Sequence, residues 1–323
     1  MTLTEAFAVS SAFSTPVILT DGDLGSNVAS FARHLRAANL SPKTHKTYLE
    51  GLALLAKFLA TRGMPTDVAA IRREHLEAFI EDQLSRWKPS TAANRFSSIR
   101  PFFGWLVEEG EIRGSPMTRM RKPKLPDYAP PVLADAQLTA LFRACDGTTF
   151  EQRRDAALIR ILYSTGARLS EVTHLRWTPA EPETNDVDLD ARIMRVMGKG
   201  RRERITRLTP KAVKALDRYL RARARHPHAT LPHLWLGQKG RMTDSGITQV
   251  VRRRGVAAGI AGLHPHLFRH TYAHEALAAG MQEGEVMALA GWRTREMLSR
   301  YARSAERDRA LAAADRVNVG DRI

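Results

Sequence analysis

Six residues in the second half of the chain have side chains suited to attack on a phosphate. In chain order they are Arg168, Lys199, His266, Arg269, Trp292 and Tyr301. The phenol of Tyr301 is a possible nucleophile, and the other five can hydrogen-bond or protonate a phosphate. Fixed positive charge stabilises the oxygens on phosphorus, and an acid protonates the leaving oxygen. If these residues meet in one place, they can break a DNA strand without a metal.

Each of these residues, taken alone, has a commoner structural role. A lone arginine usually pairs with a surface carboxylate, a turn lysine is usually exposed, and a lone histidine, tryptophan or tyrosine usually packs in a core or an interface. Local spacing adds some weight to the chemical interpretation. Glu171 follows Arg168 by three residues, close enough on a helix to orient its guanidinium, and His266 and Arg269 share a helix face through the same spacing.

The charge balance points to a polyanionic partner. The chain has 50 Lys and Arg against 34 Asp and Glu, a net charge of +16. Nucleic acid is the usual partner of such an excess, and we expect double-stranded DNA. The alternative is a basic surface that serves only solubility. Hydrophobic content of 43% is typical of a globular protein.

The cysteine count and the N-terminal sequence limit the classes of protein to which the chain can belong. A single cysteine, Cys145, excludes a disulfide framework and a cysteine-based zinc site, and we expect it in the core. His270 and His274 share a helical spacing, but the nearby acids complete no recognisable zinc motif, so we predict no metal and no cofactor. Without a signal peptide or a membrane-length apolar segment, we expect a cytoplasmic, nucleoid-associated protein.

A length of 323 residues predicts two domains. We expect a flexible Ser- and Thr-rich leader over 1–22, a helical domain over 23–113, and a second domain over 132–323. Between them, 113–131 holds five prolines and five basic residues. That proline density predicts an extended linker, 114–131, which either lies along DNA or is merely a soluble tether.

Periodicity predicts the elements of both domains. In the first, helices are expected over 24–38, from Ser41-Pro42 to Gly63, over 73–86, and from about Ser90 onward. In the second, alternation over 187–208 predicts a hairpin or three-stranded ribbon with its turn near Lys199. The remaining helices are expected over 135–144, 149–165, 169–175, 210–226, 243–258, 266–279, 282–290, 294–302 and 304–316.

Basic residues at helix starts, in loops and in the ribbon are candidates for contacts with DNA phosphates. They are Lys43, Lys46, Arg86, Lys88, Arg95, Lys122, Lys124, Arg201 and Arg202. For any one of them, solvated surface charge is the alternative.

Four stretches together carry a resemblance: TGARLSE, GKGRRER, HPHLFRHTYA, and LAGW with Tyr301 nine residues after its tryptophan. The chain resembles the tyrosine recombinases of the phage-integrase and Xer type, over both domains. The resemblance implies a mainly helical fold with a small β-ribbon (an α+β catalytic domain). It also implies that the two domains form a C-shaped clamp around DNA, the first being a SAM-like core-binding domain.

The resemblance also implies roles. Arg168 and Arg269 clamp the scissile phosphate, Lys199 is the acid for the leaving 5′-oxygen, and His266 assists proton transfer. Trp292 stands where many members have histidine, and it keeps hydrogen bonding but not proton transfer. Tyr301 forms a 3′-phosphotyrosyl link. Its short separation from Trp292 in sequence suggests, by analogy, attack within its own subunit, and attack in a partner subunit stays open.

The implied activity is site-specific recombination through a Holliday junction. Dimers would bind inverted half-sites and a tetramer would form the synapse. Two rivals remain: a type IB topoisomerase or telomere resolvase on the same fold, and a non-catalytic DNA-binding regulator. Two departures are expected: a longer connection over Thr178–Asp186, and no extra DNA-binding domain ahead of residue 24.

Overall fold

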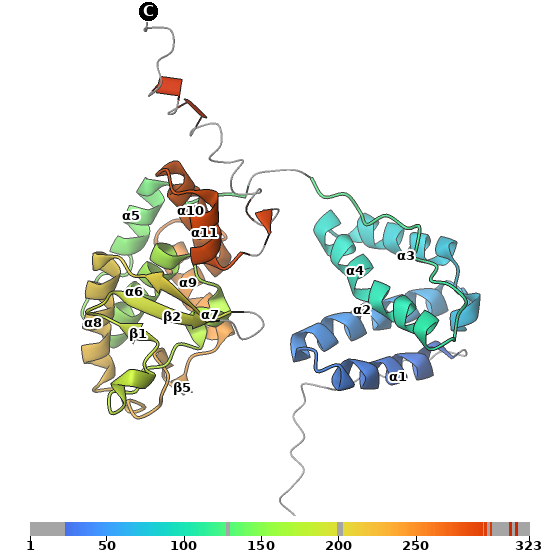
Figure 1. Ribbon diagram of the computed structural model, residues 1–323, viewed down its shortest axis with the longest axis horizontal. Coiled ribbons are helices and arrows are strands. Elements are labelled where there is room, and N and C mark those ends of the chain that lie inside the picture. Colours follow the sequence, from blue (N-terminus) through green and yellow to red (C-terminus); the bar gives the residue numbers. More distant parts are fainter. Residues whose placement is uncertain are drawn as a thin grey trace, which may run out of the picture. The chain divides into compact units, whose positions relative to one another are not determined.

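The computed structural model describes residues 23–126, 130–198 and 203–292, together with 294, 295, 298, 310, 311, 314 and 315. The chain divides into two compact units, Met1–Asp127 and Tyr128–Ile323. Figure 1 shows the helices of both units. The expected leader over 1–22 lies outside the described residues, and the expected clamp, which concerns the relation between the units, stays a prediction.

The first unit is a bundle of helices around one aromatic-rich core. Its elements are α1 (Leu24–Ala37), α2 (Pro42–Thr61), the short 3-10 helix η2 (Val68–Ala70), α3 (Arg73–Arg86) and α4 (Pro89–Glu108). The predicted start of α2 is confirmed: the Ser41 hydroxyl accepts a hydrogen bond from the Thr44 N–H at 3.1 Å, and Pro42 occupies the first turn. Helix α2 packs against α1, α3 and α4.

The proline-rich stretch is not wholly a tether. Met117 and Met120 are buried in the core of the first unit, and the boundary between the units falls after Asp127. The first part of the expected linker, 114–131, is therefore packed against the helical bundle, because its two methionines bury apolar area there.

The second unit is built around α6 (Phe150–Thr165), which packs against α8, α9 and α10. Its other helices are α5 (Asp135–Arg143), α7 (Leu169–Thr173), the 3-10 helix η3 (Pro182–Thr184), α8 (Pro210–Arg223), α9 (Asp244–Ala257), α10 (Pro265–Ala278) and α11 (Glu283–Ala290). Cys145 is buried in the main core, as predicted, and burial raises the pKa of its thiol to about 12. Among the described residues, no helix is long and apolar enough to cross a membrane.

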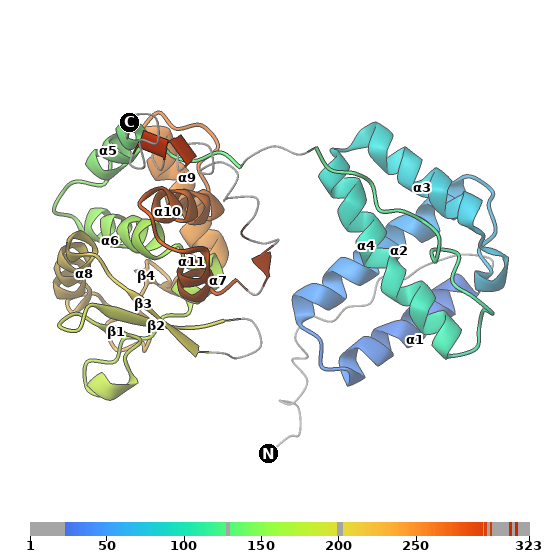
Figure 2. The same ribbon diagram turned by 45° about the horizontal axis from the view of Figure 1, so that its top comes forward.

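The predicted ribbon is confirmed as a three-stranded antiparallel sheet in the order β1-β2-β3 (Figure 2). Its strands are β1 (Val187–Asp188), β2 (Ile193–Met197) and β3 (Glu203–Arg207), and a second hairpin pairs β4 (Leu236–Gly237) with β5 (Gly240–Arg241). The register sets Val196 opposite Arg204, so Arg204 faces inward beside the buried Met194 and Thr206. The predicted class, mainly helical with a small β-ribbon, is confirmed.

The end of α6 is fixed by a glycine that no other residue could replace cheaply. Gly166 caps the helix in the left-handed conformation, with φ of +58°. A Cβ built there would lie 2.5 Å from the ring of Tyr272. The chain therefore turns sharply at Gly166, and Arg168 follows two residues later as the N-cap of α7, as predicted.

We expect Gly166→Ala to destabilise the protein far more than Gly259→Ala. Both glycines have positive φ, but a Cβ at Gly259 meets nothing within 4 Å. The left-handed backbone alone costs about 1 kcal/mol, and the overlap with Tyr272 adds about 2 kcal/mol more. Urea unfolding of the two variants measures the difference, and equal losses would contradict the steric account.

Candidate active site

The C-terminus of α11 organises the site. The backbone N–H of Trp292 donates to the Met287 carbonyl at 2.9 Å, and the backbone N–H of Gly291 donates to the Ala288 carbonyl at 3.3 Å. Gly291 has a φ of +67°. This is the pattern of a Schellman cap. It pairs two carbonyls of the last turn with backbone N–H groups and leaves the carbonyls that follow without a backbone donor.

Three arginines from three other elements bind those open carbonyls. Arg204 of β3 donates through Nε to the Leu289 carbonyl at 2.9 Å. Arg269 of α10 donates through Nη2 to the Ala290 carbonyl at 2.8 Å, and Arg168 donates through Nη2 to the Gly291 carbonyl at 2.9 Å. The negative end of a helix dipole favours cations, so this helix end is a suitable anchor for all three.

Arg269 is held almost entirely inside the protein. Its side chain is 2% exposed, and Nη1 donates to the Gly166 carbonyl at 2.8 Å. Its guanidinium also lies over the ring of the buried Trp292, 4.6 Å from the centroid, a cation–π contact. Two left-handed glycine caps thus supply carbonyls to the arginines, Gly166 to Arg269 and Gly291 to Arg168.

Arg168 is the more open of the two predicted phosphate ligands, with 30% of its side chain exposed. Its backbone N–H donates to Glu171 Oε2 at 2.7 Å, and Nη1 donates to Glu171 Oε1 at 2.9 Å. The predicted role of Glu171 in orienting the guanidinium therefore has its geometry in the structure. Glu171 lies on the first turn of α7, where its carboxylate also suits the helix dipole.

Arg204 is the site residue that the sequence analysis missed. Its Nη1 and Nη2 donate to the two oxygens of Glu171, each at 2.7 Å, as a bidentate pair. Burial by itself raises the pKa of the Glu171 carboxyl, but the hydrogen bonds from Arg204 and Arg168 outweigh it and hold that pKa below its ordinary value. The one signal in the sequence was strand alternation, which places Arg204 on the inner face of the ribbon.

His266 lies one turn before Arg269 on α10, as predicted, with part of the residue open to solvent and part covered by the protein. Loss of solvation around the ring, followed by the positive charges of Arg269, His264 and Arg168, lowers the pKa of His266. Its ring meets that of His270 edge-on, with centroids 4.5 Å apart, and burial lowers the pKa of His270 to about 4. A neutral imidazole at His266 can accept or donate a proton near neutral pH.

Lys199 and Tyr301, with Arg201 and Arg202, lie outside the described residues. So do most of the predicted helices over 294–302 and 304–316. The structure therefore brings together Arg168, Glu171, Arg269 and Trp292, with His266 on the same helix as Arg269. Among the described residues no group of acids, histidines and cysteine is arranged to hold a metal ion.

In the first unit, the candidate DNA contacts differ in how far they are engaged. Lys43 and Lys88 are exposed at helix starts, and Lys46 forms an exposed ion pair with Glu50. Arg86 pairs with Asp82. Arg95 is partly buried, bonds to Gln83 and lies over the ring of Trp87, 5.0 Å from its centroid. Lys122 and Lys124 are exposed in the irregular segment before the unit boundary.

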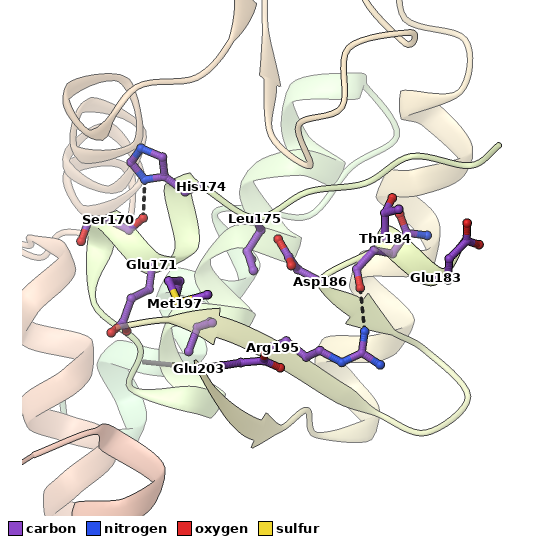
Figure 3. Close-up of a pocket in the computed structure, with 12 residues that line it drawn as sticks. Ser170, Glu171, His174, Leu175, Glu183, Thr184, Asp186, Arg195, Met197 and Glu203 are labelled. Carbon is purple, nitrogen blue, oxygen red and sulfur yellow. Dashed lines mark hydrogen bonds between the residues drawn. The ribbon is translucent and has the colours of Figure 1, made fainter. Parts of the chain in front are cut away.

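A cavity of about 530 Å³ lies on the other side of Glu171, between α7, the ribbon and 183–186 (Figure 3). It is lined by four acids, Glu171, Glu183, Asp186 and Glu203, and by one arginine, Arg195. Arg195 donates to the Asn185 carbonyl at 3.1 Å. An acidic cavity of this kind does not suit a phosphate.

Comparison with known proteins accounts for both units. Residues 131–308 match the model "Phage integrase family", and residues 28–110 match "Phage integrase, N-terminal SAM-like domain". The chain belongs to the phage integrase family. It is 31% identical to a protein named tyrosine recombinase XerC of Oceanobacillus iheyensis, over 78% of this chain and 83% of that protein. A protein of the same name from Chromohalobacter salexigens is 32% identical, over 80% of this chain and 84% of that protein.

Solved structures show the same fold. The XerH site-specific recombinase bound to a palindromic difH substrate gives a TM-score of 0.69 at 17% identity, over 93% of this chain and 90% of that chain. A lambda integrase dimer bound to a core site gives 0.66 at 15% identity, over 85% and 94%. Family and relatives make this chain a tyrosine-type site-specific DNA recombinase, and they do not favour the topoisomerase, resolvase or regulator alternatives.

We expect Glu171→Gln to lower stability most near neutral pH, with a deficit that shrinks in acid. Because the folded-state pKa of Glu171 lies below its ordinary value of 4.5, its contribution is complete above that value and is lost as pH falls through the folded pKa. Leaving two arginines around a neutral amide costs about 2 kcal/mol or more. Urea unfolding of wild type and Glu171→Gln at about pH 7 and about pH 3.5 measures the difference in their free energies of unfolding. A difference that is larger at the lower pH would contradict this prediction.

Proposed function

We propose that this recombinase cuts DNA by attack of Tyr301 on a phosphate held by Arg168 and Arg269, and rejoins strands through a 3′-phosphotyrosyl link and a Holliday junction. The convergence of these two arginines on the end of α11 carries the proposal. Tyr301 follows that helix end by ten residues in sequence, counted from Gly291. This short separation supports attack within the same subunit.

The charge of the anchored groups suits the transition state. Arg168, Arg204 and Arg269 contribute three positive charges and Glu171 one negative charge, leaving +2. A phosphodiester attacked by a phenolate passes through a five-coordinate phosphorus that carries about two negative charges. Cations positioned before the reaction stabilise that charge without reorganisation. The same cations lower the cost of forming the phenolate of Tyr301.

Two residues would move protons. Lys199, in the turn of the ribbon, would protonate the leaving 5′-oxygen. His266, with its lowered pKa, would be largely neutral near pH 7 and so able to take up the proton of the phenol or of an incoming hydroxyl. Trp292 would hydrogen-bond the phosphate while its ring packs against Arg269.

We propose that the first unit contacts the same DNA through Lys43, Lys46, Lys88 and Arg95, with Arg86, Lys122 and Lys124 contributing further contacts, and that Arg201 and Arg202 of the second unit contact it as well. A DNA partner inside the cell would place the protein in the cytoplasm, at the nucleoid. The solved relatives include a complex with a palindromic substrate, a dimer on a core site and a tetramer on a Holliday junction. They support dimers on inverted half-sites and a tetrameric synapse.

The experiment that tests this function uses nicked suicide DNA carrying the flanking genomic sequence, in the presence of EDTA. Wild type should form a covalent protein–DNA adduct on a denaturing gel, and Tyr301→Phe should form none. An adduct that survives in Tyr301→Phe would mean that another residue is the nucleophile. If wild type forms no adduct on DNA that it binds specifically, the proposed chemistry fails.

Removal of the residues after Arg303 tests the assembly. Leu311 is 58% exposed, so the C-terminal segment presents an apolar side chain suited to a neighbouring protomer. The truncated protein should bind a half-site with wild-type affinity but fail to form a synapse, as followed by native gel and by strand exchange. Intact strand exchange would contradict a role for this segment in assembly.

A further inference from the structure

We infer that Arg204 is a positioning residue: it shares the Glu171 carboxylate with Arg168 and thereby fixes both the direction and the available charge of Arg168. The inference rests on the proposed function, because it concerns how Arg168 is presented to the phosphate. No contact between Arg204 and DNA is required by it.

Among the described residues, Glu171 is the only acid bonded to Arg168 or Arg204, and the two arginines share it evenly. Oε1 accepts from Arg168 Nη1 at 2.9 Å and Arg204 Nη1 at 2.7 Å. Oε2 accepts from the Arg168 backbone N–H at 2.7 Å and Arg204 Nη2 at 2.7 Å. With its side chain 2% exposed, Glu171 has little access to water and depends on these donors.

The sharing of the Glu171 carboxylate between Arg168 and Arg204 determines how much positive charge these arginines can present to a phosphate. With Arg204 in place, the anchored groups sum to +2. Without it, the buried carboxylate has only the Arg168 guanidinium as a charged partner, and the sum falls to +1. Arg168 would then form a tight ion pair with Glu171, turned away from the phosphate and largely neutralised. Removing the carboxylate as well would return the sum to +2.

Packing fixes Arg204 in this position. Its side chain is 12% exposed, and Nε bonds to the Leu289 carbonyl, next to the carbonyls that hold Arg269 and Arg168. A Cβ on Gly291 would lie 3.2 Å from the Arg204 guanidinium, so the lack of a side chain at this cap makes room for the guanidinium. Arg204 also follows Lys199 by five residues in sequence, and its bonds tie β3 to the phosphate-binding arginines.

The test compares full-length Arg204→Gln, Glu171→Gln and the double variant for single-turnover adduct formation at saturating suicide DNA. Arg204→Gln should be slowed about 100-fold with half-site affinity nearly unchanged, because charge is lost from the transition state and not from DNA binding. The double variant should recover at least about 10-fold of that loss, since pairs in direct contact are not additive. Arg204→Lys, which keeps the charge but not the bidentate geometry, should fall between wild type and Arg204→Gln.

Arg207→Gln is the matched control. Arg207 lies on the same strand and is exposed, and its guanidinium donates to the Ala191 carbonyl at 3.1 Å. It should cleave at close to the wild-type rate. Thermal unfolding of every variant separates a slower reaction from a smaller folded fraction. If Arg204→Gln is poorly folded, Arg204→Lys with and without Glu171→Gln replaces it; adding Glu171→Gln should then recover part of the loss, and no recovery would contradict the inference.

Three outcomes overturn the inference while leaving the proposed function standing. They are wild-type cleavage by Arg204→Gln, a double variant no faster than Arg204→Gln, and an equal loss in Arg207→Gln. In each case wild type still forms the adduct and Tyr301→Phe does not. If wild type itself forms no adduct on specifically bound DNA, the proposed function fails and the inference fails with it.

Discussion

One helix end holds the arginines of the candidate site in place. The last two residues of α11, Leu289 and Ala290, and the cap Gly291 each accept a hydrogen bond from a different arginine through their carbonyls. A carbonyl orients a guanidinium without cancelling its charge, whereas a carboxylate does both. Anchoring on backbone therefore lets the protein fix three cations within one small volume and still present positive charge outward. Glu171 is the acid that the site does include, and two arginines share it.

The surrounding fold explains how elements far apart in sequence reach this helix end. The left-handed cap at Gly166 turns the chain from α6 into α7, so that Arg168 follows within two residues of a carbonyl that binds Arg269. Helix α10 packs on both α6 and α11, which places Arg269 between the two caps. The ribbon contributes Arg204 from its inner face. Both caps need positive φ, and each lies where a Cβ would meet a neighbouring side chain.

Periodicity and capping residues predicted most of the helices, because an apolar face with a Ser, Thr or Pro at its start leaves little choice of local structure. The same reasoning placed Arg168 at a helix start and His266 with Arg269 on one face. It could not identify the carbonyls that accept hydrogen bonds from the arginines, because every residue has a backbone carbonyl whatever its type. Arg204 was missed for a related reason: in a ribbon with many cations, only the strand register distinguishes an inward-facing arginine from a solvated one. Met117 and Met120 fell within the predicted linker because the density of neighbouring prolines indicated an extended segment there, even though both side chains are apolar.

The arrangement also sets a tension between stability and function. Arg269 is 2% exposed, and the three arginines Arg168, Arg204 and Arg269 together carry more positive charge than Glu171 cancels. Burying positive charge costs free energy, and the carbonyl bonds and the Trp292 ring offset part of that cost. A phosphate bound as proposed would add negative charge beside these cations, and a five-coordinate phosphorus would add more. The proposed site would then favour the transition state over the bound substrate, which is the order that catalysis requires.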